Sequence, residues 1–184
     1  MLPAQIGEGD FMCTSLHSSG MSRRGFGALA LAGAGLSLLP MRARAADIEA
    51  LAIMCIDYRL VDDAVRFFDT DRHLVKQYDL VALAGASLAA VAPAFPSSSA
   101  AFWDHVAIAR QLHNIKRVVM LDHRQCGAYR VQFGSQFAEG GDAELEQHRG
   151  IMKLAKAEFE RRKIGLGLEF HLMALDGTVE PVAV

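Results

Sequence analysis

Two short stretches carry the residues that could do chemistry. Cys55-Ile56-Asp57-Tyr58-Arg59 contains a thiol, and Asp122-His123-Arg124-Gln125-Cys126 contains an imidazole and a thiol three residues apart. A His and a Cys at this spacing can reach one metal ion from the first turn of a helix. Imidazole and thiolate together favour zinc over magnesium, calcium or manganese. Three protein ligands would leave a fourth tetrahedral position open, which is the pattern of a catalytic zinc site.

Asp57 and Arg59 add a charged pair beside the first thiol. In an extended segment Cys55, Asp57 and Arg59 would share one face. A guanidinium beside a carboxylate keeps the carboxylate ionised and orients it. Such an aspartate could accept the proton of a metal-bound water, or could occupy the open metal position itself.

The elements that must position these residues are short apolar runs that alternate with helical patterns. Strands alternating with helices predict βαβ units, and therefore an α/β fold with a mostly parallel sheet flanked by helices. Ligands bind at the carboxyl ends of such strands, and Cys55, Gly85 and His123 each follow or end a predicted strand. We expect strands at residues 48–56, 79–83, 116–121 and 168–175, and helices at 62–68, 97–114, from 126 onward and 142–163.

Each motif is weak on its own. A cysteine at a strand end is usually a small buried apolar residue, so the metal site depends on the two motifs meeting at one sheet edge. The other histidines (His73, His105, His113, His148 and His171) are expected at the surface or half-buried. The predicted inward residues of the second helix are Phe102, Trp103, Val106, Ala109 and Leu112, with serines 97–99 as its N-cap.

Composition supports a single globular domain. The chain has 184 residues, of which 52% are hydrophobic, and its formal net charge is −2. This charge gives no general affinity for nucleic acid. Three cysteines do not form a disulfide framework.

The N-terminal region has the order of an export signal. Ser22-Arg23-Arg24-Gly25-Phe26 is a twin-arginine pattern, an uncharged run follows to Met41, and Ala43-Arg44-Ala45 is an A-x-A cleavage site. We therefore expect residues 1–45 to be an extension and signal peptide, and residues 46–184 to be the zinc-binding domain. The twin-arginine export machinery would be a partner and the periplasm the destination. An uncleaved membrane anchor is the alternative, and translation could start at Met21.

The two motifs together resemble the β-class carbonic anhydrases. The similarity is carried by Cys55-Ile56-Asp57-Tyr58-Arg59 and by His123-Arg124-Gln125-Cys126-Gly127, and it extends over about residues 51–131. By position, the resemblance implies Cys55, His123 and Cys126 as ligands of one zinc per chain. It also implies that Asp57 accepts a hydrogen bond from a zinc-bound hydroxide and that Arg59 holds Asp57.

The resemblance implies reversible hydration of CO2 to bicarbonate and a β-carbonic anhydrase-like fold. Residues Leu83, Ala84, Ala86 and Leu88 could form the wall of a narrow apolar pocket. The loop at Gly85 lacks the Arg or Asn usual in the family, and the family's N-terminal helical arm is missing, so a homodimer or higher oligomer is an open expectation. Two alternatives remain: a carbonyl sulfide or carbon disulfide hydrolase on the same fold, and a non-catalytic zinc protein.

Overall fold

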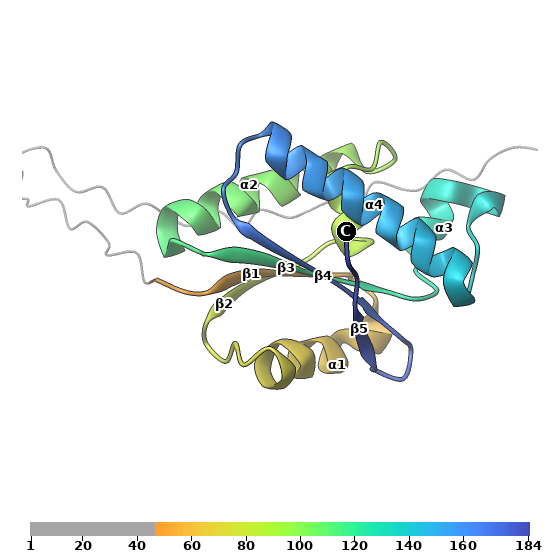
Figure 1. Cartoon of the computed structure of the whole chain (residues 1–184), viewed down its shortest axis with the longest axis horizontal. Helices are drawn as coiled ribbons and strands as arrows, with labels where there is room; N and C mark the ends of the chain where they lie inside the picture. The colour runs from red at the N-terminus through yellow and green to blue at the C-terminus, as the bar shows by residue number, and fades with distance from the viewer. Residues whose placement is uncertain (1–46) are drawn as a thin grey trace, which may run out of the picture. The chain divides into compact units, whose positions relative to one another are not determined.

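A five-stranded sheet organises the described part of the chain, residues 47–184 of the computed structural model. The strand order is β2-β1-β3-β4-β5, and every pairing is parallel except that of β4 with β5. The predicted α/β class with a mostly parallel sheet is therefore confirmed (Figure 1). The strands are β1 (Ala50–Met54), β2 (Tyr78–Ala82), β3 (Arg117–His123), β4 (Gly167–Met173) and β5 (Val179–Pro181).

Helices cover both faces of the sheet. α2 (Pro96–His113) and α4 (Gly141–Arg161) lie on one face, and α1 (Val61–Arg66) lies on the other (Figure 1). α1 continues into a π-helical turn, Phe67–Asp71, and α3 (Gly127–Phe133) follows β3 directly. Every helix within residues 47–184 is too short or too polar to cross a membrane.

The two faces of β1 bury different side chains. Leu51 and Ile53 pack into the core under α2 and α4, whereas Ala50, Ala52 and Met54 pack against α1. A central parallel strand is covered on both faces, so its sequence is a continuous apolar run instead of an alternating one. The same reasoning explains the apolar run in β3, whose residues from Val118 to His123 are all buried.

Several predicted details are corrected by the structure. β1 is shorter than the predicted 48–56, and β3 extends two residues beyond 121, so that it ends at His123. α2 begins with Pro96 at its first turn and has no side-chain cap, so the serines are not its N-cap. Leu112 is 47% exposed, so it is not an inward residue of α2. Pro96 replaces a cap because its fixed φ suits the first helical turn.

The predicted domain boundary at residues 45 and 46 lies outside the described residues. The twin-arginine motif, the cleavage site and the choice between Met1 and Met21 also lie there. All of them stay predictions.

Candidate metal centre

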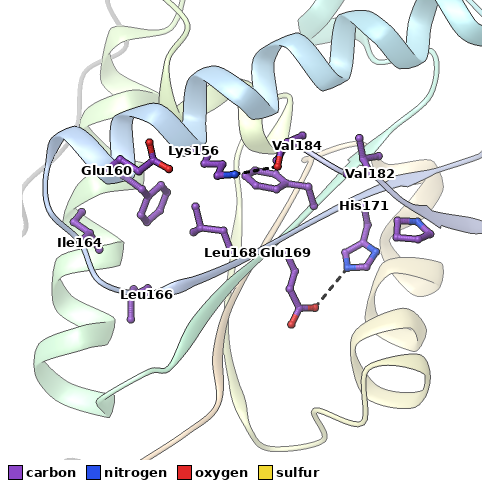
Figure 2. Close-up of a pocket in the computed structure, with 13 residues that line it drawn as sticks. Lys156, Glu160, Ile164, Leu166, Leu168, Glu169, His171, Val182 and Val184 are labelled. Atoms are coloured by element: carbon purple, nitrogen blue, oxygen red, sulfur yellow. Dashed lines mark hydrogen bonds and ion pairs between the residues drawn. The ribbon is translucent and has the colours of Figure 1, made fainter.

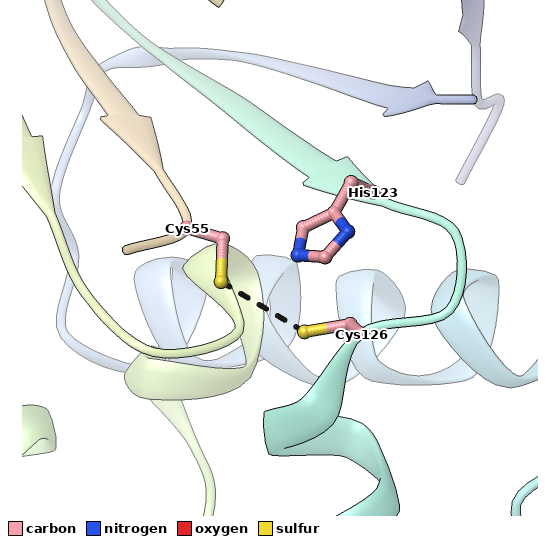
Figure 3. Close-up of side chains that lie close together, drawn as sticks. All are labelled: Cys55, His123 and Cys126. Carbon is pink, nitrogen blue, oxygen red and sulfur yellow. Dashed lines mark hydrogen bonds between the residues drawn. The ribbon is translucent and has the colours of Figure 1, made fainter. Parts of the chain in front are cut away.

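The register of β1 and β3 brings the two motifs to one edge of the sheet. Met54 pairs with Leu121, so Cys55 directly follows β1 beside the end of β3, where His123 is the last residue. Cys126 is the N-cap residue of α3, three positions further on. Figure 3 shows the three side chains converging from β1, β3 and the start of α3.

The separation of the two sulfurs fits a shared metal ion. Cys55 Sγ and Cys126 Sγ lie 3.8 Å apart, and the ligand atoms of Cys55, His123 and Cys126 all lie within 4.8 Å of one another. A disulfide would bring the sulfurs to about 2.05 Å. Two thiolates bound tetrahedrally to zinc at about 2.3 Å would be about 3.8 Å apart. The observed distance therefore matches two ligands of one tetrahedral ion.

The imidazole of His123 is held in the tautomer that a ligand needs. Its Nδ1 lies 2.8 Å from the carbonyl oxygen of Arg124, which can only accept, so Nδ1 carries the proton and donates. Nε2 is then a free acceptor, and it is buried without a hydrogen-bond partner among the described residues. An unsatisfied buried nitrogen costs free energy, and a metal ion at this position would remove that cost.

The contact between the two thiols of the cluster shifts their pKa values in opposite directions. The hydrogen bond from Cys126 lowers the pKa of Cys55 to about 4, with further help from His123 and from the Gly85 N–H, which donates to Cys55 Sγ at 3.3 Å. The same interaction with Cys55, together with burial, raises the pKa of Cys126. Burial opposes protonation of His123, but its contact with Cys55 raises its pKa. A bound dication would reverse this balance by holding both sulfurs as thiolates.

Asp57 and Arg59 form a two-pronged ion pair beside the cluster. Arg59 Nε donates to Asp57 Oδ1 at 2.9 Å, and a terminal guanidinium nitrogen donates to Oδ2 at 2.7 Å. Hydrogen bonding from Arg59 lowers the pKa of Asp57 to about 2. Asp57 Oδ2 lies 3.8 Å from His123 Nε2, so the ionised carboxylate borders the cluster.

Asp57 and Arg59 do not lie in an extended segment. Asp57 is the N-cap of a 3₁₀ turn, Tyr58–Leu60, and its Oδ1 also accepts from the backbone N–H of Arg59 at 3.1 Å. The turn itself brings the two side chains together, since both lie on the same short loop. The pair predicted from the sequence is present, but a turn and not a shared strand face produces it.

Comparison with known proteins identifies the family. Residues 45–148 match a family model described as "Putative carbonic anhydrase". The chain belongs to this family. Among curated relatives, the uncharacterized protein RC0076 of Rickettsia conorii is 33% identical over 136 residues, which is 74% of this chain and 73% of the relative. An uncharacterized protein of Rickettsia bellii is 32% identical over 136 residues, or 74% of this chain and 82% of the relative.

Solved structures of β-carbonic anhydrases are also similar. The β-carbonic anhydrase CafA of Aspergillus fumigatus aligns with a TM-score of 0.48 and 18% identity, covering 79% of this chain and 80% of CafA. A tetrameric β-carbonic anhydrase of Sordaria macrospora aligns with a TM-score of 0.43 and 14% identity, covering 76% of this chain and 82% of that one.

A small cavity lies beside the cluster on the α1 side. Its volume is about 10 Å³, roughly the room that one water molecule needs. The predicted wall is wrong: Leu83, Ala84, Ala86 and Leu88 do not line this cavity, and Leu88 instead packs against Cys55 and Cys126 in a separate apolar cluster. The residues lining the cavity are Met54, Cys55, Asp57, Leu60, Ala64, Leu121, Asp122, His123 and Met173.

A larger pocket of about 590 Å³ is formed by α4, β4 and the last residues of the chain (Figure 2). Its lining is mainly apolar, with Lys156, Glu160 and Glu169 among its polar residues. None of the three cluster residues lines it. The Cys55, His123 and Cys126 cluster therefore does not open into this larger pocket.

Sequence reasoning missed a buried polar layer behind the cluster. The prediction that His148 lies at the surface or half-buried is wrong, because it is fully buried, as is Glu144 on the same helix. His171 is also buried, at 8% exposed. One signal was available: Glu144 and His148 are four residues apart, and Met152 continues the same spacing on the buried face of α4.

Proposed function

We propose that this chain is a zinc-dependent carbonic anhydrase that interconverts CO2 and bicarbonate. The single observation that carries the proposal is the Cys55, His123 and Cys126 cluster, with its sulfurs 3.8 Å apart. Membership of the carbonic anhydrase family supports the same reaction. The Sγ atoms of both cysteines and Nε2 of His123 would hold one zinc ion, and three protein ligands leave one coordination position open.

Zinc, when bound, supplies a nucleophile at neutral pH by acidifying a coordinated water, a property for which carbonic anhydrases of another class are the standard example. Asp57 would accept a hydrogen bond at Oδ2 and thereby orient the attacking oxygen toward CO2. Because its pKa is about 2, the carboxylate is ionised and acts only as an acceptor at neutral pH. The apolar side chains of Met54, Leu60 and Leu121 would exclude other water from this side.

The test is zinc analysis combined with a stopped-flow CO2 hydration assay on the chain from Ala46 onward. We expect about one zinc per chain and hydration well above the buffer rate. Cys126→Ser should lose both zinc and activity. Asp57→Ala should keep zinc but lose about 100-fold in rate, because it removes the acceptor that orients the attacking oxygen. A fully zinc-loaded protein that hydrates CO2 no faster than buffer would contradict the proposal.

A second candidate is hydrolysis of carbonyl sulfide or carbon disulfide at the same site. Two thioether side chains, Met54 and Met173, line the cavity, and such polarizable groups suit sulfur-bearing substrates. Parallel assays with CO2 and both sulfur compounds discriminate between the candidates. Higher kcat/KM for a sulfur compound would favour this one.

A non-catalytic zinc protein would require Asp57 to occupy the fourth zinc position. Both carboxylate oxygens of Asp57 are engaged by Arg59, which favours the catalytic arrangement. Spectroscopy of the zinc-loaded or cobalt-loaded protein decides: an exchangeable water ligand supports catalysis, whereas a bound Asp57 carboxylate at every pH supports the non-catalytic role.

We also propose that the protein is exported to the periplasm through the twin-arginine machinery, supported by Arg23, Arg24 and the A-x-A sequence that ends at Ala45. The mature protein should begin at Ala46, as determined by N-terminal sequencing of the periplasmic fraction. Replacing both arginines with lysine should retain the protein in the cytoplasm. A mature chain that still carries Arg23 and Arg24 would rule out cleavage. A homodimer or higher oligomer also stays a prediction, and light scattering would test it.

A further inference from the structure

Two buried side chains of α4 contact the segment that carries two of the three proposed metal ligands. Glu144 and His148 are four residues apart, so they lie on one face of the helix. Both are 0% exposed. Polar side chains are rarely buried so completely unless they have specific partners, and here each of the two has a partner in the β3–α3 segment.

Glu144 contacts the residue just before Cys126. Its Oε1 accepts a hydrogen bond from the backbone N–H of Gln125 at 2.5 Å, and its Oε2 accepts from Gly140 N at 2.9 Å. Gln125 has a φ of 55°, a left-handed conformation that residues other than glycine rarely adopt. Its backbone therefore needs a contact from outside the loop. Arg124, whose guanidinium lies 3.5 Å from Oε2, balances the charge of the buried carboxylate.

His148 contacts the residue just before His123. Its Nδ1 lies 2.9 Å from Asp122 Oδ2, which also accepts from the hydroxyls of Ser87 and Tyr129 at 2.7 and 2.6 Å. Tyr129 lies in α3, three residues after Cys126, and its ring packs against the His148 imidazole with centroids 3.9 Å apart. The segments before His123 and after Cys126 are therefore both fixed to α4.

We propose that Glu144 and His148 are positioning residues that set the spacing and direction of His123 and Cys126, so that both reach the metal ion bound by Cys55. The inference rests on the proposed function, because it needs a metal at the cluster. Neither side chain touches a ligand atom, so each acts through the backbone or through Asp122. A merely structural role would stabilise the fold without changing the metal geometry.

The test compares zinc affinity and the visible absorption of cobalt(II) in the full chain and its variants. Glu144→Ala removes the acceptor for Gln125, and His148→Phe keeps a ring against Tyr129 but removes the nitrogen that faces Asp122. Each should weaken zinc binding about 10- to 100-fold in chelator competition, the usual effect of losing a group that orients a ligand. The cobalt ligand-field bands should shift in position and intensity, because they report the geometry of the ligands.

A matched control separates positioning from general stability. Phe159→Leu alters a buried residue at the far end of α4, so it should lower the melting temperature but leave zinc affinity and the cobalt spectrum unchanged. Glu144→Gln retains one acceptor oxygen and should weaken zinc binding less than Glu144→Ala. If Glu144→Ala does not fold, the zinc affinity and cobalt spectrum of Glu144→Gln, compared with those of Phe159→Leu, decide whether Glu144 positions the ligands.

The outcomes separate this inference from the proposed function. Wild-type affinity and an unchanged cobalt spectrum in the Glu144 and His148 variants, with only thermal stability lost, would overturn the positioning role and leave the function intact. A wild-type protein that binds neither zinc nor cobalt would overturn both.

Discussion

The guanidinium of Arg59 determines what the Asp57 carboxylate can do. Two parallel hydrogen bonds from Arg59 fix the plane of the carboxylate. A weaker contact of 3.5 Å joins Arg59 to the carbonyl oxygen of Gln125, which lies between His123 and Cys126. A bidentate contact gives direction as well as charge. At the scale of single residues, a substitution at Arg59 can therefore change the orientation of the Asp57 carboxylate while the carboxylate stays ionised.

Arg59→Lys tests this separation. Lysine keeps the positive charge but cannot form the planar two-pronged contact, so Asp57 should stay ionised and lose its fixed orientation. We expect zinc content to be unchanged and kcat/KM for CO2 hydration to fall about 10- to 100-fold. Arg66→Lys, at an exposed ion pair of α1, is the control and should retain the wild-type rate. If the Arg59→Lys variant hydrates CO2 at the wild-type rate, the two-pronged contact between Arg59 and Asp57 is not needed for activity.

At the scale of elements, the turn after β2 depends on one glycine. Gly85 has a φ of 79°, and its N–H donates to Cys55 Sγ. A Cβ at this position would lie 2.9 Å from Leu88 Cβ and 3.2 Å from Ala128 Cβ. The absence of a side chain at Gly85 permits this tight turn and lets the backbone approach the sulfur closely.

Gly85→Ala should therefore destabilise the protein by roughly 1 to 3 kcal/mol, because the left-handed backbone and the close contacts both oppose a side chain. The measurement is urea unfolding of the zinc-loaded protein. Gly150→Ala is a suitable control, since Gly150 lies in α4 and a Cβ there would meet no atom of its surroundings within 4 Å. That change should be neutral or stabilise by about 0.5 to 1 kcal/mol. Equal changes in the free energy of unfolding for Gly85→Ala and Gly150→Ala would contradict the role of the turn at Gly85.

The strand ends could be predicted from the sequence, whereas the packing around them could not. Short apolar runs before Cys55 and before His123 indicate buried parallel strands, and the parallel arrangement alone places both residues at one edge. The spacing along α4 indicates the face that carries Glu144 and His148, but their partners Gln125 and Asp122 lie about 20 residues or more away, and a local pattern does not identify them. The predicted cavity wall is wrong for a similar reason, since the ends of β1 and β3, with single residues of α1 and β4, line the cavity instead of the loop at Gly85.

At the scale of the whole molecule, buried His171 links stability to pH. Burial lowers its pKa, and the positive charge of Arg72 lowers it further, although Glu169 lies 3.6 Å away and opposes the shift. Phe67 packs edge-on against the ring with centroids 4.9 Å apart. Below about pH 6.5 the unfolded chain binds a proton at this histidine more readily than the folded chain does. The folded state therefore loses stability as the pH falls through this range.

His171→Leu should remove this dependence. Between pH 7.5 and 5.5 the free energy of unfolding of the wild type should fall by up to about 1 kcal/mol more than that of the variant. Denaturant unfolding of the wild type and the variant at both pH values gives these free energies. A substitution of His105, an exposed residue of α2, is the control. Parallel pH dependence in wild type and His171→Leu would refute the assignment.

The distance along the chain between the two proposed thiolate ligands has a further consequence. Cys55 and Cys126 are 71 positions apart, yet their sulfurs nearly touch. A metal ion held by both would be a removable cross-link that closes this long loop, and long loops gain the most from such closure in chain-entropy terms. An unfolded chain presents only His123 and Cys126 as near neighbours, so the metal favours the folded state by mass action. Metal occupancy would then require that the central strands β1 and β3 have already paired.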